Sequence, residues 1–422
     1  MNCAVRLALP VSSTNDAGHE RNDRSQKEQI PVPLVTCFYC GFDLPRSEFS
    51  DEHIWPDALG GDYLPRLWRT DDVCARCNSM SGVYVDGAFI RGWAGSRERG
   101  HDARMYLSLT EPLKTVLPLD YLGKLTDSAI PSGDVADWWA GPCGATIVHF
   151  RPEETSDLWK RYLGGDPRAK KAAAGRAYMA LASNNEYWLL GALGSFKKHF
   201  KRAKRYIITP GLPSNWTAFE QINREDPVQA ADLAVIDAML ARAKANQPTH
   251  ARLEIDLTNV GQRWLCKLGL AIGCQIFGAG FGKHADGELL RCAFREASPE
   301  KRKQYKVRGS AYFSGGSGLE FLAWPAGWVL QLQVLNGILS LTIVTPSGQA
   351  MAVQVTDDQN LISQVPADIN AGQAWIVVPS AARAVGPIGI ADYVAHITKS
   401  VPQADLSALE AHCIDPSSLP AC

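Results

Sequence analysis

Hydrophobic residues recur along this chain with two different spacings, and the spacing changes from helical to extended towards the C-terminus. Apolar positions three and four residues apart predict helices over 187–200, 227–246 and 264–282. Alternating apolar and polar positions predict strands, with hairpin turns between the first three, at 327–334, 337–344, 350–355 and 374–378. The C-terminal part is therefore predicted to be an antiparallel sheet packed against a helix, which is an α+β arrangement.

The first half of the chain has a less regular pattern. An alanine-rich run follows Asp166 and Pro167, which suit the N-cap and the first position of a helix, so a helix is expected over 170–182. The polar residues near the N-terminus lack a hydrophobic period, which predicts a disordered leader over 1–30. We expect a small module at 31–100 and a larger mixed helical and antiparallel-sheet region at 101–422, with a sub-boundary near 210–250.

Composition narrows the class of protein. The chain has 422 residues, of which 46% are hydrophobic and 21% are charged, as in soluble globular proteins. The sequence has no run of 18 consecutive apolar residues, so it does not predict a membrane span. The formal net charge of -1 gives no general attraction to nucleic acid, so any such binding must come from local patches.

One local patch is strongly basic. Between Asp166 and Arg205 there are ten Lys or Arg residues and two acids, a density typical of sequence-independent phosphate binding. A solvated helix end whose lysines interact with the helix dipole explains the same pattern. The residues predicted to contact nucleic acid are Arg76, Arg91, Lys197, Lys198, Lys201, Arg202, Lys204 and Arg205.

Eleven cysteines divide into two kinds. Cys37, Cys40, Cys74 and Cys77 form two CxxC pairs, which is the spacing of a structural zinc site. The other seven are scattered, and an odd total favours a reducing compartment, hence a cytoplasmic location. We interpret these seven as buried small residues or tail residues: Cys3, Cys143, Cys266, Cys274, Cys292, Cys413 and Cys422.

The residues between the CxxC pairs carry a second motif. Cys37-Phe38-Tyr39-Cys40, Glu52-His53-Ile54-Trp55-Pro56, Leu59-Gly60-Gly61 and Cys74-Ala75-Arg76-Cys77-Asn78 together resemble the zinc-stapled HNH endonucleases of the ββα-metal superfamily. The resemblance implies a β-hairpin followed by a helix, with His53 as the general base that activates water. It also implies a catalytic Mg²⁺ or Mn²⁺ held at Glu52, Asn78 and the third position. That third position is usually a histidine, and here it is Asp86.

The chemistry of these side chains supports the same reading. Histidine is the side chain whose pKa lies nearest to working pH, and phosphodiester hydrolysis needs a deprotonated water. Oxygen donors suit a hard divalent ion. If a helix begins near Asn78, Asp86 lies about 80° around its axis, so both could face one ion. Asn78 could also cap the helix, and the glycines at 60 and 61 suit a turn with positive φ.

Three functions remain open from the sequence. The leading hypothesis is a metal-dependent endonuclease that cuts DNA, with RNA not excluded, in defence against foreign DNA. The alternatives are a non-catalytic zinc-knuckle module that binds nucleic acid and an interaction protein in which zinc is only a staple. Whether the protein forms a homodimer or binds a regulatory protein partner stays open, because the sequence shows no heptad repeat and no apolar stripe that would form an interface.

Overall fold

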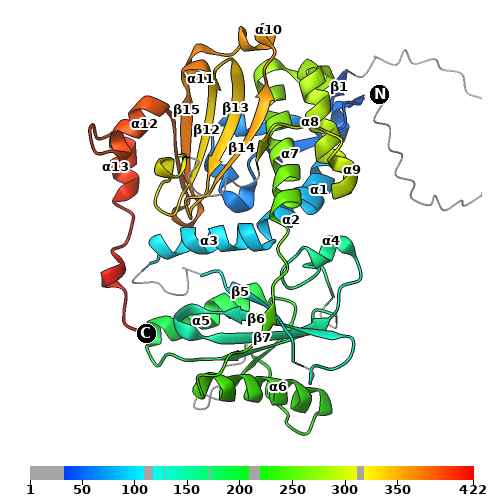
Figure 1. Cartoon of the computed structure of the whole chain (residues 1–422), viewed down its shortest axis with the longest axis vertical. Helices are drawn as coiled ribbons and strands as arrows, with labels where there is room; N and C mark the ends of the chain where they lie inside the picture. The colour runs from blue at the N-terminus through cyan, green and yellow to red at the C-terminus, as the bar shows by residue number, and fades with distance from the viewer. Residues whose placement is uncertain (1–32, 109–116, 128, 171–172, 209–218, 311–317) are drawn as a thin grey trace, which may run out of the picture.

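The computed structural model describes residues 33–108, 117–127, 129–170, 173–208, 219–310 and 318–422. These residues form two bodies, with helix α3 (Trp93–Met105) lying across the junction between them (Figure 1). The N-terminal module and the C-terminal sheet make one body, and the middle of the chain makes the other. The predicted leader at 1–30 lies outside the described residues. No helix in the described ranges is long and apolar enough to cross a membrane.

The N-terminal module is two small hairpins followed by a helix. The second hairpin, β3–β4, leads directly into α1, which is the predicted ββα order. A π-helical turn follows α1, and the helical stretch ends before Gly92, where the chain becomes extended. The elements are β1 (Leu34–Thr36), β2 (Asp43–Pro45), β3 (Phe49–His53), β4 (Arg69–Cys74), α1 (Ala75–Ser81), the π-turn (Gly82–Asp86) and α2 (Gly87–Ile90).

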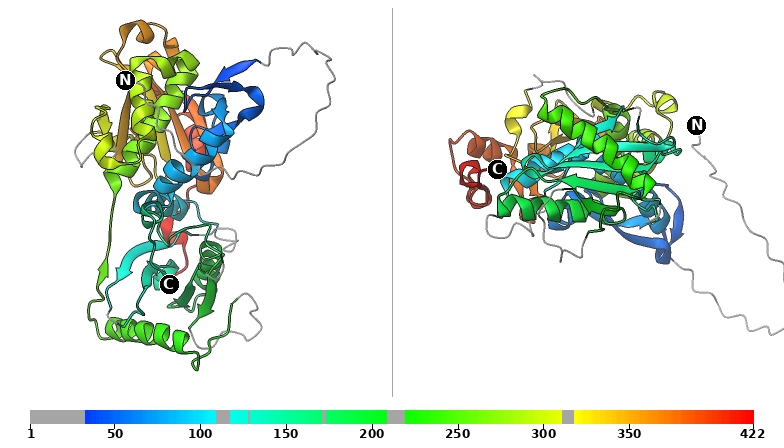
Figure 2. Two further views of the ribbon diagram at one scale, coloured as in Figure 1. Left: turned by 90° about the vertical axis from the view of Figure 1, so that its right-hand side faces the viewer. Right: turned by 90° about the horizontal axis from the view of Figure 1, so that it is seen from below.

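The middle body is a six-stranded sheet with one long helix on each face (Figures 1 and 2). The strand order is β10-β5-β6-β7-β8-β9, and only β8 and β9 pair in parallel. Helix α5 packs on one face and α6 on the other. The elements are β5 (Asp120–Leu125), β6 (Asp134–Ala140), β7 (Thr146–Pro152), α4 (Asp157–Lys160), β8 (Arg176–Ala180), α5 (Glu186–His199), β9 (Lys204–Ile207), α6 (Pro227–Lys244) and β10 (Ala251–Arg252).

The prediction of a helix over 170–182 is wrong. Residues Arg176–Ala180 form β8, which is hydrogen-bonded to β7 on one side and to β9 on the other. Alanine favours a helix only weakly, and the two neighbouring strands together outweigh that preference. The side chains of Ala177, Tyr178 and Met179 are all buried between the sheet and its helices.

The C-terminal sheet is antiparallel, as predicted, with the order β11-β14-β13-β12-β15-β16. Helix α7 starts earlier than the predicted 264–282 helix and ends at Phe277. The elements are α7 (Leu257–Phe277), α8 (Ala285–Arg295), α9 (Pro299–Arg302), β11 (Gly309–Ser310), β12 (Trp328–Leu335), β13 (Ile338–Val344), β14 (Ala350–Thr356), α10 (Gln359–Ile362), α11 (Ala367–Ala371), β15 (Gln373–Val378), β16 (Arg383–Gly389), α12 (Ile390–Ile397) and α13 (Ala404–Glu410).

The N-terminal module shares its hydrophobic core with α7 and the C-terminal sheet. The ring of Trp55 lies 5.3 Å from that of Trp264 and 5.4 Å from that of Trp328, measured between centroids. Phe89 stacks on Trp264 with 3.8 Å between centroids. All four side chains are buried, so residues far apart in the chain fix the position of the module.

Two of the cysteines read as unpaired form a disulfide. Cys143 and Cys422 are bonded across 279 residues, which joins the C-terminal tail to the middle body. Two hydrogen bonds also hold the tail: the Ile414 N–H donates to the Met105 carbonyl, and Trp188 Nε1 donates to the Pro420 carbonyl. Sequence spacing could not show this pair, because only the path of the tail along the junction brings the two thiols together (Figure 1).

Candidate functional site

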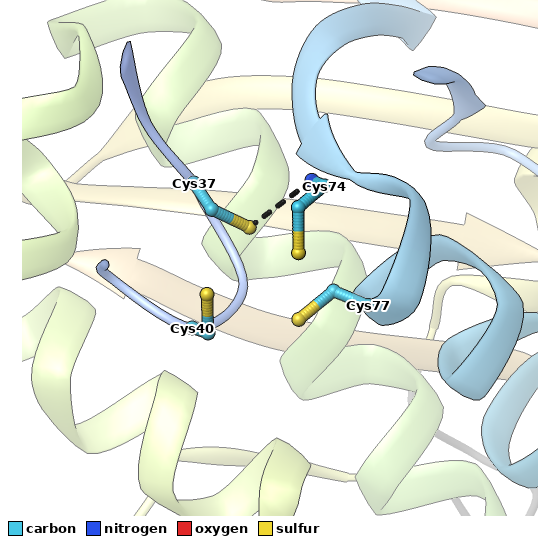
Figure 3. Close-up of side chains that lie close together, drawn as sticks. All are labelled: Cys37, Cys40, Cys74 and Cys77. Carbon is cyan, nitrogen blue, oxygen red and sulfur yellow. Dashed lines mark hydrogen bonds between the residues drawn. The ribbon is translucent and has the colours of Figure 1, made fainter. Parts of the chain in front are cut away.

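The four cysteines of the two CxxC pairs converge on one point. Cys37 and Cys40 lie on the turn after β1, Cys74 ends β4 and Cys77 lies in α1 (Figure 3). Their sulfur atoms all lie within 4.8 Å of one another. Four thiolates around zinc are about 3.8 Å apart, given Zn–S bonds of about 2.3 Å, so this cluster fits a structural zinc ion.

The burial and bonding of the cysteines agree with that assignment. Cys37 and Cys74 are buried, and the Cys74 N–H donates to Cys37 Sγ at 3.3 Å (Figure 3). Hydrogen bonding with Cys37, and then with Cys77, lowers the pKa of the Cys40 thiol. Backbone N–H groups directed at sulfur favour the thiolate form, which is the form that binds a metal.

His53 lies at the end of β3 with its side chain partly exposed to solvent. Its Nε2 atom is 2.7 Å from Asp62 Oδ1, and the exposed fraction of the His53 side chain is 23%. Asp62 belongs to a short 3-10 helix, Gly61–Tyr63, that follows the glycine turn. Gly60 has φ of 90°, as predicted, whereas at Gly61 a Cβ atom would lie 2.0 Å from the Trp55 carbonyl oxygen. The turn is therefore what brings Asp62 to the imidazole.

A row of charged side chains surrounds His53 on the same open face. Arg69, which pairs with His53 in the β3–β4 ladder, binds Asp51 Oδ2 at 2.5 Å and lies 3.6 Å from Asp62 Oδ1. Hydrogen bonding with Asp57, and then with His53, lowers the pKa of Asp62. The row therefore presents an imidazole, a guanidinium and carboxylates to solvent.

Glu52 faces the opposite side of β3 and is buried. Its Oε1 atom accepts a hydrogen bond from Tyr39 at 2.8 Å and lies 2.8 Å from Lys267 Nζ. Asp86 reaches the same ammonium group, with Oδ2 2.7 Å from Nζ. Lys267 is on α7, and its exposed fraction is 0%. Two of the three side chains predicted to hold a divalent ion thus share a lysine.

This arrangement bears directly on the predicted ion. Burial, and secondarily the charge of Glu52, raise the pKa of Asp86 to about 6, and Lys267 opposes that change. The ammonium group already supplies the positive charge that the two carboxylates need. Lys267 therefore occupies one oxygen of each carboxylate that was predicted to hold the ion, and the role of Glu52 and Asp86 as its ligands stays a prediction.

Asn78 lies inside α1 and holds the strand that carries His53. Its amide nitrogen donates to the Asp51 carbonyl at 2.8 Å and to Ser50 Oγ at 3.1 Å. The β3–β4 register shifts between Ser50 and Glu52, so Asn78 fixes the backbone at that bulge. The alternative role as a helix cap is wrong, because the N-cap position of α1 is Cys74.

The residues predicted to contact nucleic acid are spread over both bodies. Arg76 is exposed on α1 beside Cys77, and Arg91 follows α2 at the junction. The other six lie on the middle body, at the end of α5 and along β9: Lys197, Lys198, Lys201, Arg202, Lys204 and Arg205. The structure brings four of the eight together in one cleft at the junction, Arg91, Lys198, Lys201 and Arg202, and the other four do not line it.

Sequence reasoning missed four residues that shape the site. Asp62, Arg69 and Tyr39 have no distinguishing spacing, since their importance comes from contacts across the hairpin and the zinc knuckle. Lys267 could have been found from the sequence, because it is the single charged residue among the apolar residues of 264–274. A lone charge on a core helix requires a buried partner.

Comparison with known proteins identifies this part of the chain only. The searches of curated proteins and of solved structures returned no match. Residues 37–94 match the family model described as HNH endonuclease, and they include the four-cysteine cluster and the β3–β4–α1 unit with His53. This segment of the chain is therefore similar to the HNH endonuclease family.

Proposed function

We propose that this protein is an HNH endonuclease that hydrolyses phosphodiester bonds in DNA, with His53 as the general base. The observation that carries the proposal is the contact between His53 and Asp62, 2.7 Å long, on an open face of a segment that matches the family. A base must reach a water molecule beside the substrate, and a partly exposed imidazole can do so.

Asp62 is proposed to orient His53. A carboxylate at Nε2 favours the tautomer that carries its proton on that nitrogen, which leaves Nδ1 to accept a proton from water. The positive charge that then forms on the imidazole is stabilised by Asp62. Arg69 lies on the same face and is proposed to attract the phosphate.

The requirement for Mg²⁺ or Mn²⁺ at Glu52, Asn78 and Asp86 stays a prediction. Such an ion would stabilise charge on the phosphate when bound. An ion at Glu52 and Asp86 would have to displace Lys267, which binds both carboxylates. No catalytic step is therefore assigned to these two side chains.

DNA is proposed to be held by the basic side chains of both bodies, and RNA remains open as a substrate. Arg76 and Arg91 lie on the nuclease side, and the basic end of α5 lies on the other. Phosphate contacts of this kind weaken as salt rises. Cytoplasmic location, defence against foreign DNA and a homodimer or regulatory partner also stay predictions.

The second candidate is a zinc-knuckle module that binds nucleic acid without cutting it, or that binds another protein. The observation in its favour is the neutralisation of Glu52 and Asp86 by Lys267, because a binding module needs no second ion. The exposed His53–Asp62 pair favours the nuclease, since a pure binder has no use for an oriented base.

A plasmid-nicking assay separates the two candidates. Supercoiled DNA is incubated with the full chain and Mg²⁺ or Mn²⁺, and His53→Ala is compared with His250→Ala, which removes an exposed imidazole from the middle body. We expect wild type and His250→Ala to nick alike and His53→Ala to be slower by about 10²–10⁴-fold. Equal nicking by all three proteins would remove His53 from the mechanism. Salt-dependent DNA binding without nicking by wild type would favour the binding module.

A further inference from the structure

A basic cleft lies at the junction of the two bodies, away from His53. It has a volume of about 470 Å³, and α3, β7 and α5 all contribute to its wall. Six cations line it, two from the nuclease side of the junction and four from the middle body: Arg91, Arg99, Arg151, Lys198, Lys201 and Arg202. A cleft of this size suits a small molecule.

The two acids of the cleft do not neutralise these cations. Glu154 Oε1 accepts the Asp166 N–H at 2.8 Å, and Asp166 Oδ1 accepts from the Arg168 N–H at 2.8 Å and lies 3.3 Å from Arg168 Nε. Arg151 Nε binds a third carboxylate, Asp137, at 2.6 Å. Among the residues that the structure describes, no ion pair forms at five of the six cations: Arg91, Arg99, Lys198, Lys201 and Arg202.

The positive charge of the cleft affects the pKa of Arg99. Burial, and then the charge of Arg91, lower the pKa of Arg99, while Asp102 opposes the change. Two guanidinium groups placed near each other without a carboxylate are unfavourable unless an anion joins them. Binding of an anion in the cleft would therefore be favourable.

Unpartnered polar groups lie deep in the same cleft. Ser195 lines it with an exposed fraction of 1%, and its hydroxyl has no hydrogen-bond partner among the residues that the structure describes. His149 also lines it: Nε2 contacts the Ala174 carbonyl at 2.7 Å, whereas Nδ1 makes no hydrogen bond within the described residues and lies 4.0 Å from Asp137 Oδ2. Buried polar groups are normally hydrogen-bonded, so each of these has capacity for a ligand.

We propose that this cleft binds a small phosphorylated molecule of nucleotide size, whose phosphate contacts Arg99 and Lys198. Arg and Lys are the usual partners of phosphate, and the hydroxyl of Ser195 can donate to a phosphate oxygen. A small ligand fits better than a duplex, because Arg151 and Ser195 are buried and the backbone of a duplex stays at the surface. Lys197, Lys204 and Arg205 do not line the cleft and remain free for DNA.

Such a ligand would connect the two bodies. Arg91 and Arg99 come from the nuclease side and Lys198 from the middle body, so one phosphate group could contact both. The bodies already meet here, since the Leu163 N–H donates to the Arg91 carbonyl at 2.9 Å. Occupation of the cleft would therefore stiffen the junction.

The test uses the full chain, with ADP and inorganic phosphate as probes in titration calorimetry and thermal unfolding. The double variant Arg99→Ala/Lys198→Ala removes two cations from the cleft. The control Arg97→Ala/Lys197→Ala removes the same charges from the same two helices at positions that do not line it. We expect ADP to bind wild type and to raise its Tm. Its affinity should fall about tenfold or more in the cleft variant and change less than about twofold in the control.

Other outcomes overturn the proposal. It fails if folded wild type binds neither probe, or if both double variants lose affinity equally, which would indicate general surface charge. It also fails if duplex DNA competes for these residues while ADP does not, because the cleft would then hold a nucleic-acid backbone. Ser195→Ala serves as a second variant without a charge change, and it should weaken ADP binding while the Tm of the free protein stays near that of wild type.

Discussion

The ammonium nitrogen of Lys267 lies 2.7 Å from Oδ2 of Asp86, although 181 residues separate the two in the chain. Glu52 Oε1 lies 2.8 Å from the same nitrogen. Helix α7 of the C-terminal region thus places a cation inside the HNH module, and the carbonyls of His53 and Ile54 lie 3.4 Å from it. The nuclease-like segment is bound to the rest of the chain by charge as well as by its shared core.

Replacing Lys267 should destabilise the body that the N-terminal module and the C-terminal sheet form together. Lys267→Met leaves two buried carboxylates without a cation, and we expect a loss of about 3–5 kcal/mol in the free energy of unfolding. Urea denaturation measures it, with Lys283→Met as the control because Lys283 is exposed. A triple variant that adds Glu52→Gln and Asp86→Asn should recover part of the loss. Unchanged stability in Lys267→Met would show that the buried ion pair does not form.

Zinc should be needed for the fold of the module. We expect about one tightly held zinc ion per chain, and Cys74→Ser should lose it and lower the Tm, because four thiolates complete the shell. Elemental analysis with a thermal melt measures both. Cys413→Ser is the control, since Cys413 lies outside the cluster. Full zinc content in Cys74→Ser would contradict the assignment.

The contribution of Asp102 to the stability of the protein should fall as pH rises from about 4 to about 7. Burial raises the pKa of Asp102 from 3.8 to about 7, although hydrogen bonds from Ser380 oppose the change. A raised pKa in the folded state means that the folded protein binds the extra proton. This stability is fully present below about pH 4 and is lost as pH rises to about 7.

The neutral variant Asp102→Asn lacks this contribution. Relative to the variant, wild type should lose at most about 1.4 kcal/mol per pH unit between about pH 4 and 7. Urea denaturation of both proteins at pH 5, 6 and 8 provides the comparison. Parallel pH profiles for the two proteins would show that Asp102 does not titrate in this range.

The Cys143–Cys422 disulfide should stabilise the protein under oxidising conditions. The two cysteines are 279 residues apart in the chain, so the bond closes a long loop and fixes the C-terminal residues on the middle body. Reduction, or Cys143→Ser, should cost about 2–4 kcal/mol. Thermal melts with and without dithiothreitol measure it, and the variant should not respond to the reductant. If wild type also fails to respond, the two thiols are not bonded.

Local patterns predicted the elements whose stability is local. The hairpin at Asn336 and Gly337 has positive φ at both residues, and Asp226 caps α6 with the proline at the next position, as the residue types indicated. The alanine-rich run at 170–182 was misread because a strand there gains two hydrogen-bonded neighbours, which no local preference reveals.

The sequence by itself determined the four-cysteine cluster, the similarity of residues 37–94 to HNH endonucleases and the antiparallel C-terminal sheet, because spacing and alternation of side chains encode them directly. Only the tertiary structure decided that Lys267 lies between Glu52 and Asp86, that Asp62 meets His53 and that the basic residues divide between a cleft and the open surface. Those contacts join distant parts of the chain, and the burial that makes them strong exists only after the core has formed.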